Sequence, residues 1–505
     1  MSTAQLFAQA IAQEFPHAFT PHQAQAAGRI GEFLADPRDN QAFILRGYAG
    51  TGKTSLVAAV VRVWKRLDRP VVLLAPTGRA AKVLSLHAGL PAYTIHKIIY
   101  RQETFKGEDT RFDRGWNGAK GALFIVDEAS MIPSDRSNPG WAGSFGGGVG
   151  TPIFGQGNLL EDLTHYVFSG DGCRIMFVGD TAQLPPVGDN ESPALRPSAL
   201  KLYGLDVRGA QLTEVVRQES ISPVLREATK LRESIAALTH PTASALTPQQ
   251  PLQLPAIATG HNLKITPGDE LIEALETAYR DWGTDQTIVV TRSNKRANVF
   301  NAGIRARIFD REEALTRGDL VMAVKNNYYW TAEAQKEMPK GQQLPMPFVA
   351  NGDSAEVVRF SNVHEMHGFT FADATLRFAD YDDLELDCRI LLDTLQSESP
   401  NLTADEQRRL FESVLEDYYD IKNERERMKA VRRDPYYNAL QIKYAYAVTC
   451  HKAQGGQWHE VFVDQGYIPD DLDVVSYLRW LYTAFTRTSE NLYLVNWPKD
   501  QTSNS

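Results

Sequence analysis

The chain has 505 residues, of which 43% are hydrophobic and 23% are charged, a balance typical of a folded globular protein. Its length exceeds what a single hydrophobic core usually serves, so we expect several domains. The net charge of −9 argues against a protein that coats nucleic acid, although a basic channel can exist inside an acidic shell.

The sequence also lacks the usual signals for membranes and for an oxidising compartment. No apolar run approaches the ~20 residues that cross a bilayer. Residues 1–15 lack the basic and apolar regions of a secretory signal. The three cysteines are far apart and have neither a zinc spacing nor a disulfide pattern. We therefore expect no membrane partner and a cytoplasmic location.

A glycine-rich loop between an apolar strand and a helix is the clearest chemical signal. Residues 42–45 are apolar, residues 47–55 read G-Y-A-G-T-G-K-T-S, and an apolar helical segment follows. Glycines let backbone N–H groups turn toward a phosphate, and the start of a helix attracts anions. Lys53 can reach the β- and γ-phosphates, and the Thr54 hydroxyl can hold Mg²⁺. The nucleotide-binding residues predicted here are Gly47, Gly50, Thr51, Gly52, Lys53, Thr54 and Ser55.

A second strand ends in two carboxylates. The apolar residues 123–126 are followed directly by Asp127 and Glu128. Asp127 at a strand end can hold Mg²⁺, and Glu128 can accept a proton from an attacking water. Farther along, residues 177–187 read F-V-G-D-T-A-Q-L-P-P-V, where Gln183 can contact both the γ-phosphate and that water. Asp180 and Gln183 can equally form an ordinary turn. Together these residues predict hydrolysis of a nucleoside triphosphate.

The first part of the chain alternates strand and helix signals, as in a parallel α/β domain. The clearest strands are residues 43–45, 71–75, 124–126 and 174–179. Residues 100–120 interrupt this pattern and resemble a small inserted hairpin. Phe105, Phe112 and Trp116 within it can stack on bases or wedge a duplex, or they can form the hairpin's own small core. Residues 134–157 and 241–256 are interpreted as loops.

A second α/β unit is expected from about residue 210, with a buried strand at 287–291. Strands at 319–326, 354–360, 372–380 and 384–392 suggest a small β-barrel inserted into this unit. Residues 402–431 predict one long charged helix, with Glu and Arg spaced four positions apart on an exposed face. The chain returns to the α/β pattern near residue 441.

Further segments resemble, in the right order, the motifs of superfamily 1B DNA helicases of the RecD and Dda type. The matches span residues 19 to 495, but they leave the inserts uncovered. The matching segments are F-T-P-H-Q at 19–23, A-P-T-G-R-A-A-K at 75–82, T-I-H at 94–96, L-T-E-V-V-R-Q at 212–218, T-R-S-N at 291–294, Y-A-V-T-C-H-K-A-Q-G at 446–455 and L-Y-T-A-F-T-R at 481–487.

The resemblance implies roles for individual residues. Gln23 would read adenine, Gln454 and Gly455 would border the nucleotide, and Arg217 and Arg487 would meet the γ-phosphate from the opposite wall of a cleft. Both arginines can also form structural ion pairs, and a lone histidine such as His96 is often a core residue. The implied DNA contacts, besides the three hairpin aromatics, are Pro76, Thr77, Thr94, His96, Thr449, His451 and Lys452.

The resemblance also implies a fold and an activity. The fold would be two RecA-like P-loop motor domains, at 1–98 with 121–209 and at 210–318 with 441–505. A hairpin at 99–120 and an SH3-like β-barrel with the long helix at 319–440 would be inserted. The activity would be ATP- and Mg²⁺-dependent unwinding, 5′→3′, on single-stranded DNA and at junctions of single and double strands. An RNA helicase, an ATP-switched single-strand-binding adaptor and a motor subunit paired with a nuclease remain alternatives.

Overall fold

The fold is described from a computed structural model of the chain. It describes residues 1–102, 111–133, 153–154, 158–214, 222–239, 256–339, 341–346, 348–469 and 472–503. Within these residues, no helix combines the length and the apolar character that crossing a membrane requires. The three cysteines, Cys173, Cys388 and Cys450, are buried and form no disulfide with one another.

The first lobe, as we call the N-terminal sheet with its helices, contains six parallel strands in the order β3-β2-β6-β8-β1-β9. The strands predicted near residues 43, 71, 124 and 174 are confirmed. The last strand ends at Leu212, so this sheet continues slightly past residue 209, where the sequence placed a boundary. The strands are β1 (Gln41–Gly47), β2 (Val71–Ala75), β3 (Ala92–Thr94), β6 (Leu123–Val126), β8 (Arg174–Gly179) and β9 (Asp206–Leu212).

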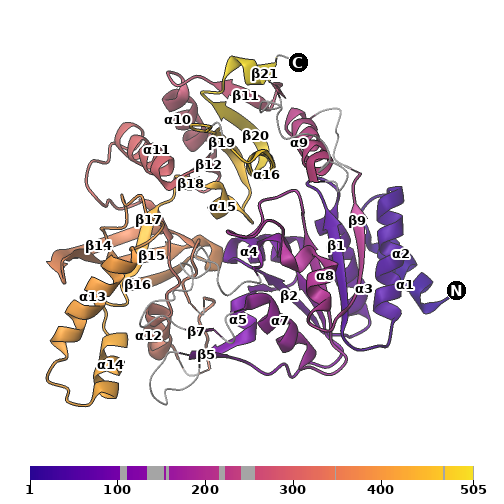
Figure 1. The fold of residues 1–505 in the computed structure, drawn as a ribbon, viewed down its shortest axis with the longest axis horizontal. Coiled ribbons are helices and arrows are strands. Elements are labelled where there is room, and N and C mark those ends of the chain that lie inside the picture. Colours follow the sequence, from indigo (N-terminus) through magenta and orange to yellow (C-terminus); the bar gives the residue numbers. More distant parts are fainter. Residues whose placement is uncertain are drawn as a thin grey trace.

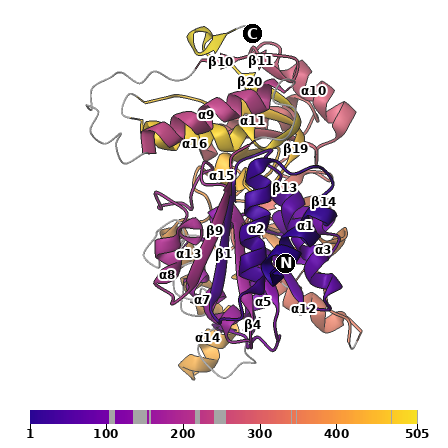
Figure 2. The same ribbon diagram turned by 90° about the vertical axis from the view of Figure 1, so that its right-hand side faces the viewer.

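Helices cover both faces of this sheet (Figures 1 and 2). Local capping fixes several of their starts: Thr20 forms a reciprocal capping box with Gln23, and the Asn158 side chain accepts from the backbone of Glu161. Trp64, fully buried, anchors α3 in the core. The helices are α1 (Thr3–Glu14), α2 (Pro21–Ala35), α3 (Lys53–Arg66), α4 (Gly78–Ala88), α5 (Ile95–Ile99), α7 (Leu159–Phe168) and α8 (Pro197–Lys201).

A small three-stranded sheet extends from the first lobe. Strand β4 (Tyr100–Gln102) pairs antiparallel with β5 (Arg111–Arg114), and β7 (Ile153–Phe154) pairs parallel with β5. The third strand belongs to the segment 134–157, which the sequence analysis interpreted entirely as a loop. A two-residue strand carries too little periodicity to be found from sequence. The rest of that segment, and the segment 241–255, lie outside the described residues.

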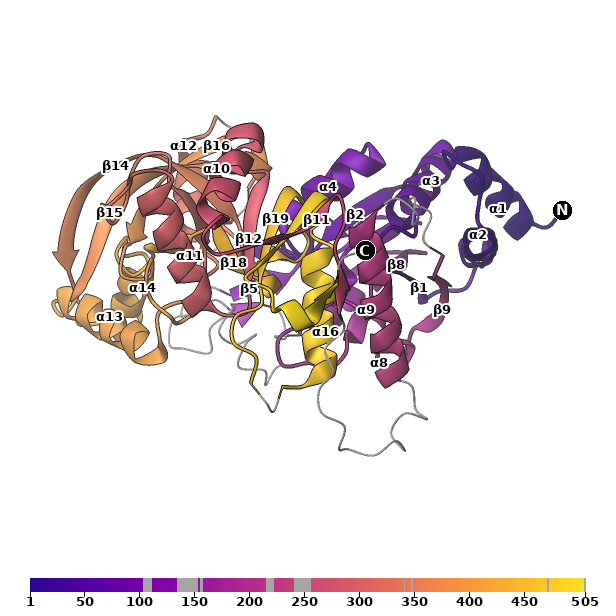
Figure 3. The same ribbon diagram turned by 90° about the horizontal axis from the view of Figure 1, so that it is seen from above.

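The second lobe contains five parallel strands in the order β11-β20-β19-β12-β18, including the predicted strand at 287–291. The α/β class with parallel sheets is thus confirmed. Helices α9 and α16 lie side by side against this sheet (Figures 2 and 3). Its elements are α9 (Pro223–Thr239), β11 (Leu263–Thr266), α10 (Leu271–Trp282), β12 (Thr287–Thr291), α11 (Asn294–Arg307), β18 (Ala447–Thr449), α15 (Cys450–Ala453), β19 (Trp458–Asp464), α16 (Val474–Phe485) and β20 (Thr488–Val495); the short β10 (Ile257–Ala258) pairs with β21 (Thr502–Ser503).

Five further strands close into a barrel, which confirms the barrel expected between the two parts of the second lobe. The barrel lies beside the second lobe, on the side away from helices α1 to α3 (Figure 1). Strand β14 is longer than predicted and forms an extended hairpin with β15. The barrel elements are β13 (Leu320–Ala323), α12 (Tyr329–Glu337), β14 (Ser354–Met366), β15 (Phe369–Phe378), β16 (Leu384–Leu391) and β17 (Leu440–Tyr444).

The single long helix predicted for residues 402–431 is wrong. The segment forms two helices, α13 (Ala404–Asp417) and α14 (Glu424–Arg432). Asn423 starts the second helix, because its side chain accepts from the backbone N–H groups of Arg425 and Glu426. Val414 and Val431, one on each helix, are buried in the same cluster as Phe371 of the barrel. A straight helix of this length would extend roughly 45 Å and would carry one end away from that cluster.

Candidate functional site

A cavity of about 890 Å³ lies between the two lobes. We call it the interlobe cavity. The carboxyl ends of β1, β6 and β8 meet at its edge, because parallel strands end on one side of a sheet. It brings Lys53, Glu128 and Gln183 of the first lobe together with Gly455 and Arg487 of the second. Five segments that are distant in the sequence therefore share one space.

The phosphate loop at residues 47–54 is shaped by its glycines. Gly50 and Gly52 have φ angles of 76° and 83°, in the left-handed region that favours glycine. A Cβ at Gly47 would lie 2.7 Å from Cγ of Lys53, so a side chain there would displace the lysine. The Lys53 ammonium donates to the carbonyl oxygens of Gly47 and Tyr48 at 2.6 and 2.9 Å. The loop is thus wound around the lysine at the start of α3.

Gln23 lies under this loop. Its Nε2 donates to the carbonyl oxygen of Thr51 at 3.0 Å, and its Oε1 accepts from the backbone of Thr20 at 3.0 Å. Both ends of the amide are therefore bound to protein, although Gln23 also lines the interlobe cavity. Reading of adenine by Gln23 stays a prediction.

The two carboxylates follow β6 as expected. The backbone N–H of Glu128 donates to Oδ1 of Asp127 at 2.9 Å, and Glu128 itself has a φ of 49°. A left-handed backbone is uncommon for a residue other than glycine, and it occurs often at functional sites. Burial, together with the Glu128 charge, raises the pKa of Asp127, while the Lys53 ammonium opposes that rise.

The donor set near the loop fits a divalent cation that prefers oxygen. Thr54 offers a hydroxyl and Asp127 a carboxylate, and both line the cavity. Among the described residues, no group of three or more His, Cys, Asp or Glu side chains could hold a metal alone. Mg²⁺ is usually bound by one or two protein oxygens together with phosphates and water, so the Thr54 hydroxyl and the Asp127 carboxylate fit this ion.

Gln183 is 7% exposed, and its Oε1 has no hydrogen-bond partner within the described structure. A buried amide oxygen without a partner is costly, so such atoms often mark a ligand site. The neighbouring Asp180 is not free: its Oδ1 accepts from the backbone of Ala182 and its Oδ2 accepts from the hydroxyl of Tyr482. The segment after β8 is thus fixed around Gln183.

Arg487 lies on the cavity wall and is 3% exposed. Its guanidinium donates to the carbonyl oxygens of Thr483 at 3.0 Å and Gly456 at 3.1 Å, both within its own lobe. Arg217 lies outside the described residues. Gln454 does not line the cavity; its amide crosses between the lobes and donates to the carbonyl oxygen of Leu184 at 2.7 Å.

The candidate DNA contacts of the first lobe lie at two helix starts. Pro76 precedes α4, and Thr77 caps that helix by accepting from the backbone of Ala80. Thr94 caps α5 in the same way. His96 is 9% exposed, its ring packs near those of Tyr100 and Phe348, and burial lowers its pKa to about 4. A neutral, buried histidine does not offer a charge to a phosphate.

The candidates in the second lobe lie at the start of α15. Thr449 precedes α15 and its side chain does not cap that helix, and His451 is exposed. Lys452 donates to Oδ1 of Asn351, and burial lowers its pKa to about 8. Of the hairpin aromatics, Trp116 is 78% exposed. Phe105 and the side chain of Phe112 lie outside the described residues.

Sequence reasoning missed two contacts that join the lobes. The hydroxyl of Tyr482 reaches Ala49 and Asp180, and the Arg79 guanidinium lies 4.0 Å from the ring centre of Trp458. Tyr482 and Arg79 lie inside the motif segments 481–487 and 75–82 quoted above. The sequence analysis identified these segments but did not assign a role to either side chain. A tyrosine in an otherwise apolar helix face is a usable signal, because a buried hydroxyl needs a partner.

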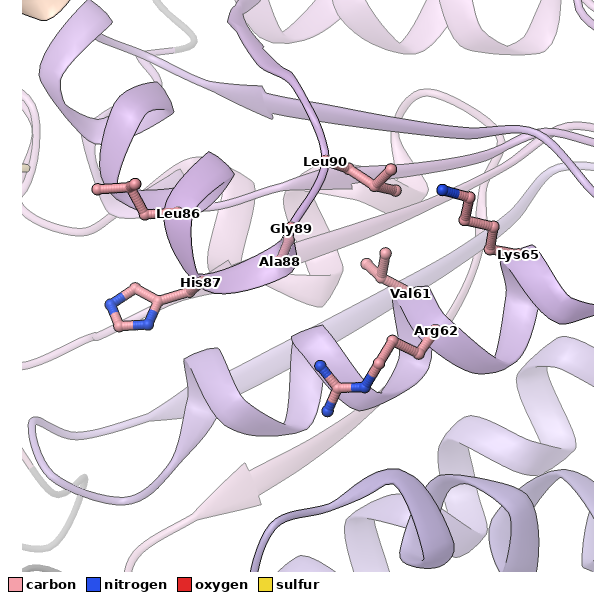
Figure 4. Close-up of a pocket in the computed structure, with 8 residues that line it drawn as sticks. All are labelled: Val61, Arg62, Lys65, Leu86, His87, Ala88, Gly89 and Leu90. Atoms are coloured by element: carbon pink, nitrogen blue, oxygen red, sulfur yellow. The ribbon is translucent and has the colours of Figure 1, made fainter.

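A second hollow, of about 320 Å³, lies between α3 and the end of α4 (Figure 4). None of the predicted site residues lines it. Its Arg62 is already paired with Glu14 at 3.0 Å. The lining residues are Val61, Arg62, Lys65, Leu86, His87, Ala88, Gly89 and Leu90.

Two family models match the chain. An AAA domain matches residues 19–138, which contain the phosphate loop and the two carboxylates, and a UvrD-like helicase C-terminal domain matches residues 444–495. A crystal structure of Pif1 helicase from Bacteroides in complex with ADP-AlF3 and ssDNA covers 96% of this chain and 94% of its own. The identity is 15% and the TM-score is 0.43, so the likeness is loose.

Two curated relatives are similar in sequence. The ATP-dependent RecD2 DNA helicase of Deinococcus radiodurans is 31% identical over 189 residues, which are 37% of this chain and 21% of the relative. The ATP-dependent DNA helicase dda of Enterobacteria phage T4 is 25% identical over 294 residues, 55% of each chain. The chain thus spans about half or less of the length of these relatives. Parts of the chain are therefore similar to an AAA domain, to a UvrD-like helicase C-terminal domain and to the RecD2 and dda helicases.

Proposed function

We propose that this protein is an ATP-dependent DNA helicase that translocates along single-stranded DNA. The observation that carries the proposal is the interlobe cavity, which contains Lys53, Glu128 and Gln183 on one side and Arg487 on the other. A site divided between two lobes lets nucleotide binding and release change their separation, which is the cycle a translocase needs. Both relatives named above are described as ATP-dependent DNA helicases.

The proposed chemistry is hydrolysis of the γ-phosphate. Lys53 and the N–H groups at the start of α3 bind the phosphates. Thr54 and Asp127 hold Mg²⁺, which when bound neutralises phosphate charge. Glu128 accepts the proton of the attacking water, and the Gln183 amide orients that water. Arg487, with Arg217, stabilises the charge that develops on the transferred phosphoryl group.

The proposed organisation follows the resemblance. The motor domains are residues 1–98 with 121–209 and 210–318 with 441–505, both RecA-like, except that the first sheet extends to Leu212 and that β17 (Leu440–Tyr444) belongs to the barrel. The hairpin at 99–120 acts as a pin at the junction of single and double strands. The barrel within 319–440 is SH3-like and guides the emerging strand. Direction of travel, 5′→3′, is likewise carried by the resemblance.

The proposed DNA path runs over the starts of α4 and α15. The two lobes are close here, because a Cβ at Gly455, just after the end of α15, would lie 3.2 Å from Oγ1 of Thr77 at the start of α4. His451 and Lys452 supply donors from the second lobe. Contacts of this kind go mostly to phosphates and carry no sequence information.

The test is ATP turnover with and without single-stranded DNA, followed by strand displacement on 5′-tailed, 3′-tailed and blunt duplexes. We expect turnover to rise with single-stranded DNA, to fall steeply with salt, and to be lost in Lys53→Ala. We expect displacement of the 5′-tailed duplex alone. Turnover indifferent to DNA would indicate an ATP-switched adaptor, and equal or greater stimulation by RNA would indicate an RNA helicase.

A further inference from the structure

The hydroxyl of Tyr482 joins the two lobes at the phosphate loop. Tyr482 lies on α16 of the second lobe and is 1% exposed. Its oxygen accepts from the backbone N–H of Ala49 at 3.0 Å, and it donates to Oδ2 of Asp180 at 2.6 Å. Ala49 is in the phosphate loop and Asp180 follows β8. One phenol from the second lobe therefore bonds two elements of the nucleotide site in the first.

The Tyr482 hydroxyl both accepts and donates a hydrogen bond in this arrangement. Burial raises the pKa of Tyr482 well above its usual value, so the phenol keeps its proton at neutral pH and can donate it to Asp180. The carboxylate of Asp180 uses its other oxygen to accept from Ala182 at 2.9 Å. Removing the hydroxyl would leave the Ala49 N–H and one carboxylate oxygen without this partner in a buried place, where unpaired polar groups are costly.

The segment from Asp180 to Leu184 is also bonded to the second lobe at Leu184. Oγ1 of Thr483 accepts from the backbone N–H of Leu184 at 2.9 Å, and the Gln454 amide donates to the carbonyl of Leu184 at 2.7 Å. Gln183 lies between these attachments and that of Asp180. A shift of α16 would therefore move the proposed γ-phosphate contact directly.

α9, which packs beside α16, also touches the loop from the second lobe. The guanidinium of Arg232 lies 4.4 Å from the ring centre of Tyr48, the residue before Ala49. The phosphate loop is thus contacted from the second lobe at two successive positions.

We propose that Tyr482 is a positioning residue that couples the phosphate loop and Gln183 to the movement of the second lobe. This inference rests on the proposed function. Tyr482 acts through its hydrogen bonds to Ala49 and Asp180 and need not touch the nucleotide itself. The predicted consequence is that DNA bound across both lobes stimulates hydrolysis much less when this hydroxyl is removed.

The chain offers a matched control on the same helix. Tyr477 of α16 is 2% exposed, and its hydroxyl donates to Oε1 of Gln465 at 2.8 Å, entirely within the second lobe. Tyr477→Phe and Tyr482→Phe each remove one buried, bonded hydroxyl and leave the ring. Tyr482→Phe removes two hydrogen bonds and Tyr477→Phe removes one, so a somewhat larger loss of thermal stability is expected for Tyr482→Phe, and only Tyr482→Phe should change the coupling.

The experiment measures ATP turnover of the full chain with and without single-stranded DNA. Tyr482→Phe should lower the stimulation by DNA about tenfold and raise KM for ATP by no more than ~3-fold, while Tyr477→Phe stays within about 2-fold of the wild type. Asp180→Asn should resemble Tyr482→Phe, because an amide cannot accept the phenol proton in the same place. The double variant should lose little more than either single one.

The outcomes separate this inference from the proposed function. Equal stimulation in the two phenylalanine variants, or additive losses in Tyr482→Phe and Asp180→Asn, would overturn the coupling role. If the wild type hydrolyses no ATP with any nucleic acid, the proposed function fails, and affinity for a fluorescent ADP decides the inference instead. Affinity weakened about 3-fold in Tyr482→Phe but not in Tyr477→Phe would support the contact to the loop. Equal affinities would refute it.

Discussion

Gln23 and Thr51 are joined by a hydrogen bond of 3.0 Å from the side-chain amide to the backbone carbonyl, which ties α2 to the phosphate loop. The same amide accepts from Thr20 at its other end. A Cβ at Gly52 would lie 2.8 Å from Nε2 of Gln23, so the amide and the loop are closely packed. Gln23 therefore supports the loop whichever base is bound.

Gln23→Ala should weaken ATP and GTP by similar factors, up to about tenfold, because it removes the support of the loop and not a contact to the base. The measurement is competition of both nucleotides against a fluorescent ADP. Thr20→Ala serves as the control, since it removes the helix cap but keeps the bond to Thr51. A loss confined to ATP would instead assign adenine recognition to Gln23.

Glu128→Gln should keep ATP and DNA binding and lower kcat by at least ~10²-fold, the usual scale for a lost general base. The change preserves shape at a residue whose backbone is left-handed, so folding should be little affected. Lys53→Ala should weaken nucleotide binding as well as turnover. Glu490→Gln is the control, because Glu490 lines the same cavity from the second lobe. Near-normal hydrolysis in Glu128→Gln would remove Glu128 from the base role.

Substitution of the hairpin aromatics by alanine, one at a time, should reveal a residue needed for unwinding but not for DNA-stimulated ATP turnover. Trp116 is the first choice, because it is 78% exposed and its loss should not disturb the core. Tyr467→Ala, at an 83% exposed aromatic far along the chain, is the control. If the variants at Phe105, Phe112 and Trp116 all unwind normally, strand separation belongs to another element.

The stability of the Asp353→Asn variant, relative to that of the wild type, should increase as the pH rises from about 4 to about 8. Asp353 is 5% exposed, and burial raises its pKa to about 7. Between the unfolded value near 3.8 and this folded value, the folded state keeps a proton that the unfolded chain has released, so the wild type loses stability with rising pH. The asparagine variant carries no such titration. The titration of this one carboxyl can change the free energy of unfolding by at most about 1.4 kcal/mol per pH unit.

The measurement for Asp353 is the difference in Tm between variant and wild type across this pH range. The amide can still bond the Ala350 N–H and the Tyr381 hydroxyl, which Asp353 contacts at 2.7 and 3.2 Å. Asp383→Asn, at an exposed turn just before the barrel strand β16, is the control. A Tm difference that does not change with pH would contradict the raised pKa.

The sequence by itself determined the phosphate loop, the carboxylates after residue 126, four of the six strands of the first sheet and one of the five strands of the second. These features depend on local pattern: glycines where the backbone turns, and short apolar runs where a strand is buried on both faces. The strands at β1, β2, β6, β8 and β12 appear where the pattern places them. The barrel was also foreseen, because alternating residues mark strands with one buried face.

Only the tertiary structure decided how these parts meet. The segment 402–431 folds into two helices because Val414 and Val431 both bury against the barrel. His96 is enclosed by Tyr100 and Phe348, a ring from another part of the fold. The bond from Ala49 to Tyr482 joins residues 433 positions apart. No local pattern encodes such a pair, since it exists only after both lobes have folded and the apolar faces of α9 and α16 have packed together.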